Sequence, residues 1–445
     1  MATIESNGVW YIVNNIVLSG VVLWRYATLI CKDGDYMKAI TVDECQQIWR
    51  EKLSHRQLQA VEYIPISEAL GRVLGEDIVA KTDMPPFRKS PYDGYVIAYS
   101  EGQQRFKVVG LIGAGETYDA PVKSDEAVRI MTGAPIPEGC DTMIMQERCD
   151  VEGGYIVVRG EIKQGDNIVP QGEECATGDV IIKAGAPLDA GAIAVAAGLG
   201  YATIAVYKPL TVLVLTSGRE VVALDKPLGA GQIYNSNQFM LTNLLASYGF
   251  SIVKTYHVSD DPALLDSEIE TVRSLSEDVD VIMSTGGVSV GLFDSMPAIY
   301  KALGAEELYT RMLMRPGAAS FGGLIQKDTH YTLCFGLSGN PTAAYNGFHL
   351  LALPILKLCQ GYSVCDTLIV PIRLGSTIHK KNPFDRYVQG VITYDEKGAQ
   401  FTPNRVFTSS ALLGLAQANG LAKLDQGKHS YEAGETVPVM ILKNK

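Results

Sequence analysis

Residues 281–295 read VIMSTGGVSVGLFDS. The change from a mostly apolar run to glycines and polar residues in the middle of this stretch indicates the fold. The stretch opens as a mostly apolar run typical of a buried strand, and Gly286 and Gly287 end that strand. Ser289 and Asp294 follow within a few residues. This pattern fits either a plain strand-to-helix turn or a ligand-binding loop at the carboxyl end of a strand.

The same order of strand and helix recurs on both sides of this stretch. Residues 210–217 form an apolar run typical of a strand, and residues 251–258 predict the next strand. Residues 236–250 between them carry apolar residues at helical spacing. A later strand leads into Pro341, and proline is common at the first position of a helix. The alternation predicts a three-layer αβα domain with a mostly parallel sheet over residues 208–360.

Short strand-like segments separated by glycine flank this central domain. They predict an inserted small β domain at residues 85–167 and a second β domain at residues 361–445. We assign residues 37–84 and 168–207 to a linker or dimerisation domain. Because 445 residues exceed what one hydrophobic core usually organises, the predicted fold class is a multi-domain α/β plus β chain, with the αβα domain between small β domains.

Residues 1–36 are an N-terminal appendage whose role the sequence leaves open. The apolar run at residues 9–24 has no basic residue before it and is a poor signal peptide. It is also shorter than the roughly 20 residues that a membrane-spanning helix needs. Thr41, followed three residues later by Glu44, predicts a capping box at the start of an amphipathic helix, so we expect folding to begin near Met37.

Charge and cysteine content exclude several classes of protein. The formal net charge is −11, and Lys and Arg do not occur in runs, which argues against a nucleic-acid partner. A membrane partner is not expected either. The eight cysteines contain no C-x-x-C pair, so neither a disulfide framework nor a zinc site is predicted, and a cytoplasmic location is the default.

Polar residues and glycines cluster where the predicted central strands end. Ligands of parallel sheets bind beyond the carboxyl ends of the strands, so Glu220, Asp260, Asp294 and the turn at residues 336–340 would line one crevice. Carboxylate oxygens suit Mg²⁺, and glycine-rich turns suit phosphate groups. Each carboxylate taken alone could equally be a solvated helix cap, and for Asp260 that is the stronger interpretation. No Walker loop is present, and no G-x-G-x-x-G motif follows a strand.

Seven strings occur in an order and at a spacing that resemble one family: SPYDGYVI, VRIMTGAPIPEGCD, TSGRE, GQIYNSN, SDDP, STGGVSVG with a following Asp, and GLSGNPTAA. From about Met37 to Lys445, the chain resembles the molybdopterin molybdenumtransferases, the MoeA proteins related to the gephyrin E domain. The resemblance implies an elongated four-part homodimer that inserts molybdate into adenylylated molybdopterin with Mg²⁺ and releases AMP. It also implies the molybdopterin adenylyltransferase as a partner.

The resemblance further implies site residues. Glu220, Asp260 and Asp294 match the family's acidic positions and would be the catalytic and metal-binding residues. The implied substrate-binding residues are Asp93, Thr132, Glu174, Gly286, Gly287, Ser289, Arg311, Arg315, Ser338, Gly339 and Asn340. In the family, the residues that match Asp93 and Thr132 close the crevice of the partner protomer.

The chain departs from the family pattern at several positions. TSGRE replaces STGDE, IYNSN replaces IYDSN and GLSGN replaces GLPGN, which places Arg219, Asn235 and Ser338 where the family has other residues. The family's K-P-G-K-P stretch appears as Arg315-Pro-Gly-Ala-Ala, so Ala318 stands in place of a lysine. Glu174 stands where Asp is usual. These departures suggest a divergent paralogue and leave open whether its substrate is the standard one. Separately, the sequence does not distinguish molybdate from tungstate.

Two other functions fit part of the sequence. Residues 287–291 match the G-x-S-x-G elbow of serine hydrolases, with Ser289 as the nucleophile. An elbow requires a helix directly after the serine, but LFDSMP intervenes. A noncatalytic gephyrin-like scaffold would keep the fold and lose acidic residues, and the retained Asp260 and Asp294 argue against it.

Overall fold

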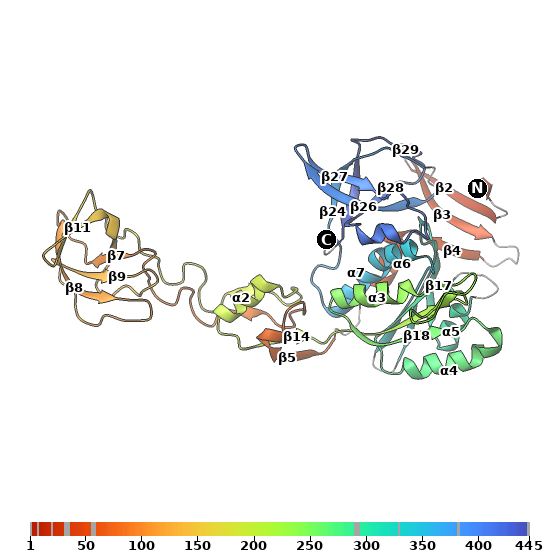
Figure 1. Ribbon diagram of the computed structural model, residues 1–445, viewed down its shortest axis with the longest axis horizontal. Helices are drawn as coiled ribbons and strands as arrows, with labels where there is room; N and C mark the ends of the chain where they lie inside the picture. The colour runs from red at the N-terminus through yellow and green to blue at the C-terminus, as the bar shows by residue number, and fades with distance from the viewer. Residues whose placement is uncertain are drawn as a thin grey trace. The chain divides into compact units, whose positions relative to one another are not determined.

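The computed structural model describes residues 2–6, 9–18, 21–30, 36–54, 59–288, 294–327, 330–380 and 383–442, with side chains from residue 39 onward except that of Val253. The chain forms two compact units (Figure 1). The first comprises residues 1–62, 71–73 and 207–445, and the second comprises residues 63–70 and 74–206.

The first unit is built on a large mixed sheet. Its strands run in the order β1-β2-β3-β4-β20-β22-β23-β19-β15-β18. The parallel part consists of β18 (Ser251–Val258), β15 (Thr211–Ser217), β19 (Val281–Thr285) and β23 (Tyr331–Leu337). Two antiparallel strands, β22 (Ala319–Gln326) and β20 (Glu306–Met312), extend it. The predicted mostly parallel central sheet is confirmed.

Helices cover both faces of this sheet (Figure 1). One face packs against α1 (Val42–Lys52), α3 (Ser236–Ser247), α6 (Pro341–Gly347) and α7 (Leu353–Gln360), and the other against α4 (Leu265–Leu275) and α5 (Met296–Ala302). Successive strand residues point to opposite faces, so Val212 and Val214 join the first core and Leu213 and Leu215 the second. Within the described residues, no helix is both long and apolar enough to cross a membrane.

Local sequence signals account for several helix boundaries. Thr41 and Glu44 form the predicted capping box at the start of α1. The helix that begins at Pro341 is interrupted by a π-helical turn, Phe348–Ala352. Pro354 has no N–H, so the carbonyl of Leu350 lacks its usual helical donor. Gln46 of α1 supplies one instead, with its Nε2 donating to Leu350 O at 3.0 Å.

The edge of the large sheet is formed by N-terminal strands that the sequence analysis did not predict. These are β1 (Ala2–Ser6), β2 (Val9–Leu18), β3 (Val21–Ile30) and β4 (Tyr36–Ile40), each antiparallel to the next. Of these strands, as far as they are described, β4 alone pairs with the rest of the sheet, where Ala39 and Ile40 lie beside Arg311 and Met312 of β20.

A chain that begins at Met37 is therefore expected to fold and to keep its activity, because it retains both paired residues of β4. The melting temperature should stay within about 1 °C of that of the full chain, which corresponds to about 1 kcal/mol for a protein of this size. Calorimetry and AMP release measured on both chains check this. Aggregation or inactivity of the shorter chain would show that the N-terminal strands are required.

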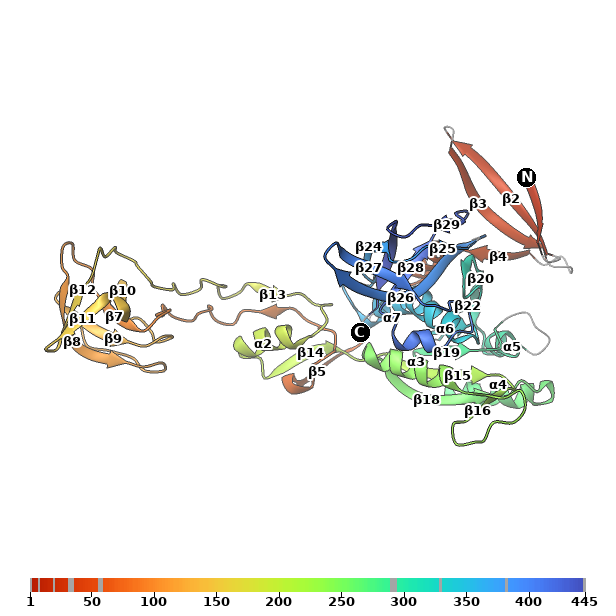
Figure 2. The same cartoon turned by 45° about the horizontal axis from the view of Figure 1, so that its top comes forward.

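A second sheet in the first unit forms the C-terminal β module (Figure 2). It contains β21 (Met314–Arg315), β26 (Asp385–Asp395), β27 (Gly398–Pro403), β24 (Ile369–Leu374), β30 (Thr436–Ile441) and β28 (Gly420–Leu424). Beside it lie the pair β25 (Ile378–His379) and β29 (Ser430–Tyr431) and the short 3₁₀ turn Leu413–Ala416. Because β21 follows β20 after one residue, it places Arg315 directly beside Arg386 of β26.

The second unit is mostly β structure. One sheet contains β10 (Thr142–Met145), β7 (Gly94–Ile97), β9 (Glu126–Ile130), β8 (Arg105–Ile112), β12 (Tyr155–Val158) and β11 (Cys149–Glu152). The rest of this unit contains α2 (Ala190–Gly198) and two strand pairs. The pairs are β5 (Val61–Pro65) with β14 (Thr203–Tyr207) and β6 (Ile78–Val79) with β13 (Val180–Ile182). The domain boundaries given by the sequence analysis stay predictions.

Candidate functional site

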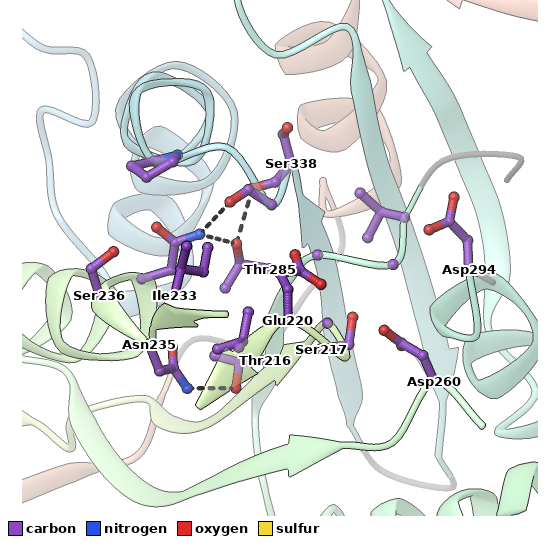
Figure 3. A pocket seen from close by; sticks show the side chains of 18 of the residues that line it. Thr216, Ser217, Glu220, Ile233, Asn235, Ser236, Asp260, Thr285, Asp294 and Ser338 are labelled. Carbon is purple, nitrogen blue, oxygen red and sulfur yellow. Dashed lines mark hydrogen bonds between the residues drawn. The ribbon is translucent and has the colours of Figure 1, made fainter. Parts of the chain in front are cut away.

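A cavity of about 330 Å³ lies at the carboxyl ends of β15, β19 and β23 (Figure 3). We call it the acidic pocket. The predicted site residues that line it are Glu220, Asp260, Asp294, Gly286, Gly287, Ser338 and Gly339. Parallel strands end at one edge of a sheet, which is why loops distant in sequence meet there.

The environment of Asp260 favours an added positive charge. Burial raises the pKa of its carboxyl above the ordinary value, and the nearby carboxylates of Glu220 and Asp294 raise it further. Ser295 Oγ, which donates to Asp260 Oδ1 at 3.4 Å, and His257 oppose this increase in pKa. A cation bound among the carboxylates would relieve their mutual repulsion.

Asp260 is not the helix cap that the sequence analysis favoured. Its neighbour Asp261 is the N-cap residue of the 3₁₀ turn Pro262–Leu264 that precedes α4, and its Oδ1 accepts from Ala263 N at 3.0 Å. The cap interpretation of Asp260 was therefore wrong by one residue. Asp260 lines the acidic pocket instead.

The donor set fits Mg²⁺ if a ligand completes the coordination. In the described part of the chain, no group of three or more His, Cys, Asp or Glu side chains is arranged to hold a metal ion alone. Mg²⁺ commonly uses one or two carboxylates together with phosphate oxygens and waters. The acidic pocket offers such carboxylates beside room for a phosphate-bearing ligand.

The glycine pair after β19 forms part of the pocket wall and is required there sterically. Gly286 and Gly287 have φ values of +88° and +60°, which other residues rarely adopt. A Cβ atom on Gly286 would lie 2.5 Å from Ser217 O, and one on Gly287 would lie 2.6 Å from Ser217 Oγ. Ser289, further along the loop, lies outside the described residues.

A hydrogen-bond network holds the turn after β23 against the end of β19. Asn237 Nδ2 donates to Thr285 Oγ1 at 3.0 Å and to Gly339 O at 2.7 Å. Thr285 Oγ1 in turn donates to Ser338 O at 2.9 Å (Figure 3). The serine that replaces proline at position 338 keeps this turn, and its Oγ accepts from Asn340 N at 3.4 Å.

The other departures near the acidic pocket also make defined contacts. Asn235 is the buried N-cap residue of α3, and its Nδ2 donates to Thr216 Oγ1 at 3.0 Å, which an aspartate could not do. Arg219 does not line the pocket, but its Nη2 donates to the backbone oxygen of Asp260 at 2.9 Å. Both substitutions therefore support residues at the pocket.

A second cavity of about 630 Å³, which we call the basic pocket, adjoins the first, because Ala319 and Ser338 line both. Among the described residues, four cations line the basic pocket: Arg315, Lys380, Arg386 and Arg405. Ala318 and Asn340 line it as well. Burial lowers the pKa of Arg386 below its ordinary value, and the nearby Arg315 lowers it further. A bound anion would offset both the cost of burying the Arg386 charge and its repulsion from Arg315.

Of these four cations, Arg315 was predicted from the sequence and the other three were not. Lys380, Arg386 and Arg405 belong to the C-terminal module, far along the chain, and none stands in a string that resembles the family motifs. The pairing of β21 with β26 brings them to Arg315. Arg311 was predicted as a substrate-binding cation, but it lines neither pocket.

The remaining predicted site residues belong to the second unit. Thr132 donates to Asp93 Oδ1 through its N at 2.7 Å and its Oγ1 at 2.8 Å, and these bonds lower the pKa of Asp93. Glu174 is exposed. Their roles toward a substrate stay predictions.

Lysine in place of Ala318 is expected to tighten oxyanion binding about tenfold at low salt. The side chain at position 318 lines the basic pocket, and a charge-assisted hydrogen bond contributes about 1.5 to 3 kcal/mol, part of which the existing cations already supply. Titration of Ala318→Lys with molybdate checks this, with Ala318→Met as an uncharged control of similar length. Equal affinities of the two variants would show that position 318 does not contact the anion.

Comparisons with known proteins cover almost the whole chain. Residues 40–200 match the family profile of the MoeA N-terminal region (domain I and II), residues 213–358 that of a probable molybdopterin binding domain, and residues 371–442 that of the MoeA C-terminal region (domain IV). These matches follow the order of the strings that suggested the family.

Individual relatives agree with the profiles. The molybdopterin molybdenumtransferase of Staphylococcus aureus (strain MSSA476) is 38% identical over 385 residues, which cover 85% of this chain and 90% of the relative. That of Staphylococcus epidermidis (strain ATCC 12228) is 36% identical over 385 residues, with the same coverage. The crystal structure of the molybdopterin biosynthesis MoeA protein from Pyrococcus horikosii has a TM-score of 0.73 and 25% identity, and covers 92% of this chain and 100% of its own. The chain belongs to the MoeA family, the molybdopterin molybdenumtransferases of molybdenum cofactor biosynthesis.

Proposed function

We propose that this transferase inserts molybdenum from molybdate into adenylylated molybdopterin and releases AMP in a Mg²⁺-dependent reaction. One observation carries the proposal: two pockets of opposite charge adjoin each other and share Ala319 and Ser338. The acidic pocket suits a pyrophosphate neutralised by a metal ion, and the basic pocket suits a tetrahedral dianion.

In the acidic pocket, the pyrophosphate would lie near the glycine turn and the amino end of α3. Ser236 and Asn237, the first residues of this twelve-residue helix, line the pocket. The amino end of a helix favours an anion. Mg²⁺ held by one or two of Glu220, Asp260 and Asp294 would offset the repulsion between carboxylates and pyrophosphate and polarise the phosphorus–oxygen bond that breaks.

In the basic pocket, Arg315 and Arg386 would bind molybdate. A guanidinium presents a planar fork of donors that matches an oxyanion better than the point charge of lysine. Arg386 is 8% exposed, so a bond to it would form away from bulk water, where electrostatic attraction is stronger. The residues shared with the acidic pocket would place the bound oxyanion beside the substrate.

The finer biological context belongs to the same proposal. We infer a cytoplasmic homodimer in which Asp93 and Thr132 of a second copy complete the site, and a molybdopterin adenylyltransferase that supplies the substrate. Size measurement by light scattering tests the dimer directly. The hydrolase alternative through Ser289 gains no support from relatives that are transferases.

The proposal is tested by quantifying AMP after anaerobic incubation of the purified protein with adenylylated molybdopterin and Mg²⁺. Separate reactions contain molybdate, tungstate or neither oxyanion, and one series contains EDTA. We expect AMP release that requires an oxyanion and is lost with EDTA. No release with either oxyanion would favour the noncatalytic scaffold.

A further inference from the structure

Ser217, the last residue of β15, carries a buried hydroxyl whose Oγ has no hydrogen-bond partner in the described part of the chain. The residue is 5% exposed. Other buried serines of the same unit are paired: Ser276 Oγ donates to Arg273 O at 3.0 Å, and Ser320 Oγ donates to Gly317 O at 2.9 Å. Buried polar groups almost always have partners, so an exception calls for a functional explanation.

The position of Ser217 connects this hydroxyl with the ligand cavity. Ser217 lines the acidic pocket, and Figure 3 shows it between Glu220 and Asp260 in this view. Its Oγ is covered by the turn at Gly286 and Gly287, where an added Cβ on the second glycine would lie 2.6 Å away. Neither glycine has a side chain, so this turn contributes only backbone atoms beside Oγ.

The neighbouring hydroxyls already have partners. Thr216 Oγ1 accepts from Asn235 Nδ2 at 3.0 Å and lies 3.0 Å from His257 Nδ1. Thr285 Oγ1 donates to Ser338 O. Unlike these two hydroxyls, Ser217 Oγ has no partner among the described residues, and a ligand in the acidic pocket can supply an acceptor.

We propose that Ser217 is a substrate-binding residue whose hydroxyl donates a hydrogen bond to a pyrophosphate oxygen of adenylylated molybdopterin, with the glycine turn shifting to admit that oxygen. A pyrophosphate brings anionic acceptors into a pocket whose own acceptors are carboxylates. Because the donor needs such an anion, this role of Ser217 rests on the proposed function.

Ser217→Ala tests the role. Loss of a structural contact would lower the melting temperature of the free protein, whereas loss of a ligand contact would not. Alanine removes a buried group that has no partner, so the melting temperature of the free protein should stay equal or rise. The KM for adenylylated molybdopterin should rise about tenfold or more, since a bond to a charged acceptor is lost, while kcat changes less. Ser217→Cys, which keeps a weak donor of similar size, should give an intermediate KM.

Ser276→Ala is the matched control, because its buried hydroxyl has a partner and does not line either pocket. It should lower the melting temperature slightly and leave KM unchanged. A Ser217→Ala variant with the wild-type KM, or one whose melting temperature falls together with its activity, would overturn the binding role while wild-type AMP release upheld the proposed function. No AMP release by the wild-type protein would overturn both.

Discussion

Replacing Asp260 with asparagine is expected to lower AMP release about 10²- to 10³-fold, the range found when one electrostatic group is removed from a catalytic site. Burial and the neighbouring carboxylates raise the pKa of Asp260, so a cation bound in the acidic pocket would stabilise its charged form. Asparagine keeps the shape of the side chain and removes its charge. The rate should be measured at saturating and at limiting Mg²⁺.

Asp261→Asn is the matched control for this variant. Asp261 carries the same chemical group one residue further along, but it caps the following turn, and asparagine is as good an N-cap residue as aspartate. We expect activity and stability close to those of the wild-type protein. Equal loss of activity in both variants would contradict a specific role for Asp260.

The raised pKa of Asp260 also predicts a dependence on pH. Between the ordinary pKa of an aspartate and the raised value, the folded state binds a proton that the unfolded state does not. The contribution of this group to the stability of the free protein is therefore lost as pH rises through the raised pKa, and Asp260→Asn should remove that dependence. Protonation competes with a cation for the same oxygens, so the Mg²⁺ concentration needed for half-maximal AMP release should rise as pH falls through the same window.

Replacing Arg386 with alanine is expected to weaken molybdate binding by about one to two powers of ten. A hydrogen bond between charged groups contributes about 1.5 to 3 kcal/mol, and Arg386 is the buried cation of the basic pocket. The KM for molybdate should rise by that factor, while the KM for adenylylated molybdopterin changes little. Arg386→Lys should recover part of the affinity, because it restores the charge without the planar fork of donors.

Arg373→Ala serves as the control for Arg386. Arg373 lies in the same C-terminal module, pairs with Asp395 at the surface and lines neither pocket. Such surface ion pairs contribute about 0 to 1 kcal/mol, so activity should stay near the wild-type level. A molybdate KM that is unchanged in Arg386→Ala would place the oxyanion elsewhere.

Some site residues were predictable because the sheet topology brings them together. Glu220, Asp260 and Asp294 each follow a strand of the parallel part, and such strands end at one edge, so recognising the strands was enough to bring the three loops together. The choice between Asp260 and its neighbour was not predictable in this way. It depends on which of two adjacent aspartates faces the first turn of the following helix, and a shift of one residue along the backbone exchanges them.

Other residues lay beyond any sequence pattern. Lys380, Arg386 and Arg405 stand in no recognisable motif. The basic pocket forms because β21, which follows β20 of the central sheet, pairs with β26 of the C-terminal module. Ser217 was read as part of a strand end. Its unpaired hydroxyl becomes apparent only when the glycine turn of β19 is seen packed over it.

Local residue patterns were enough to predict the alternation of strands and helices, the capping box at Thr41 and Glu44, and the convergence of the acidic loops. These features follow from local periodicity and from the geometry of parallel sheets. The gathering of the cations and the unpaired state of the Ser217 hydroxyl could not be predicted in this way. Those features depend on contacts between segments that local sequence does not relate, such as Arg315 with Arg386 and Ser217 with Gly287. Packing of the whole chain selects such contacts, and no single stretch of residues encodes them.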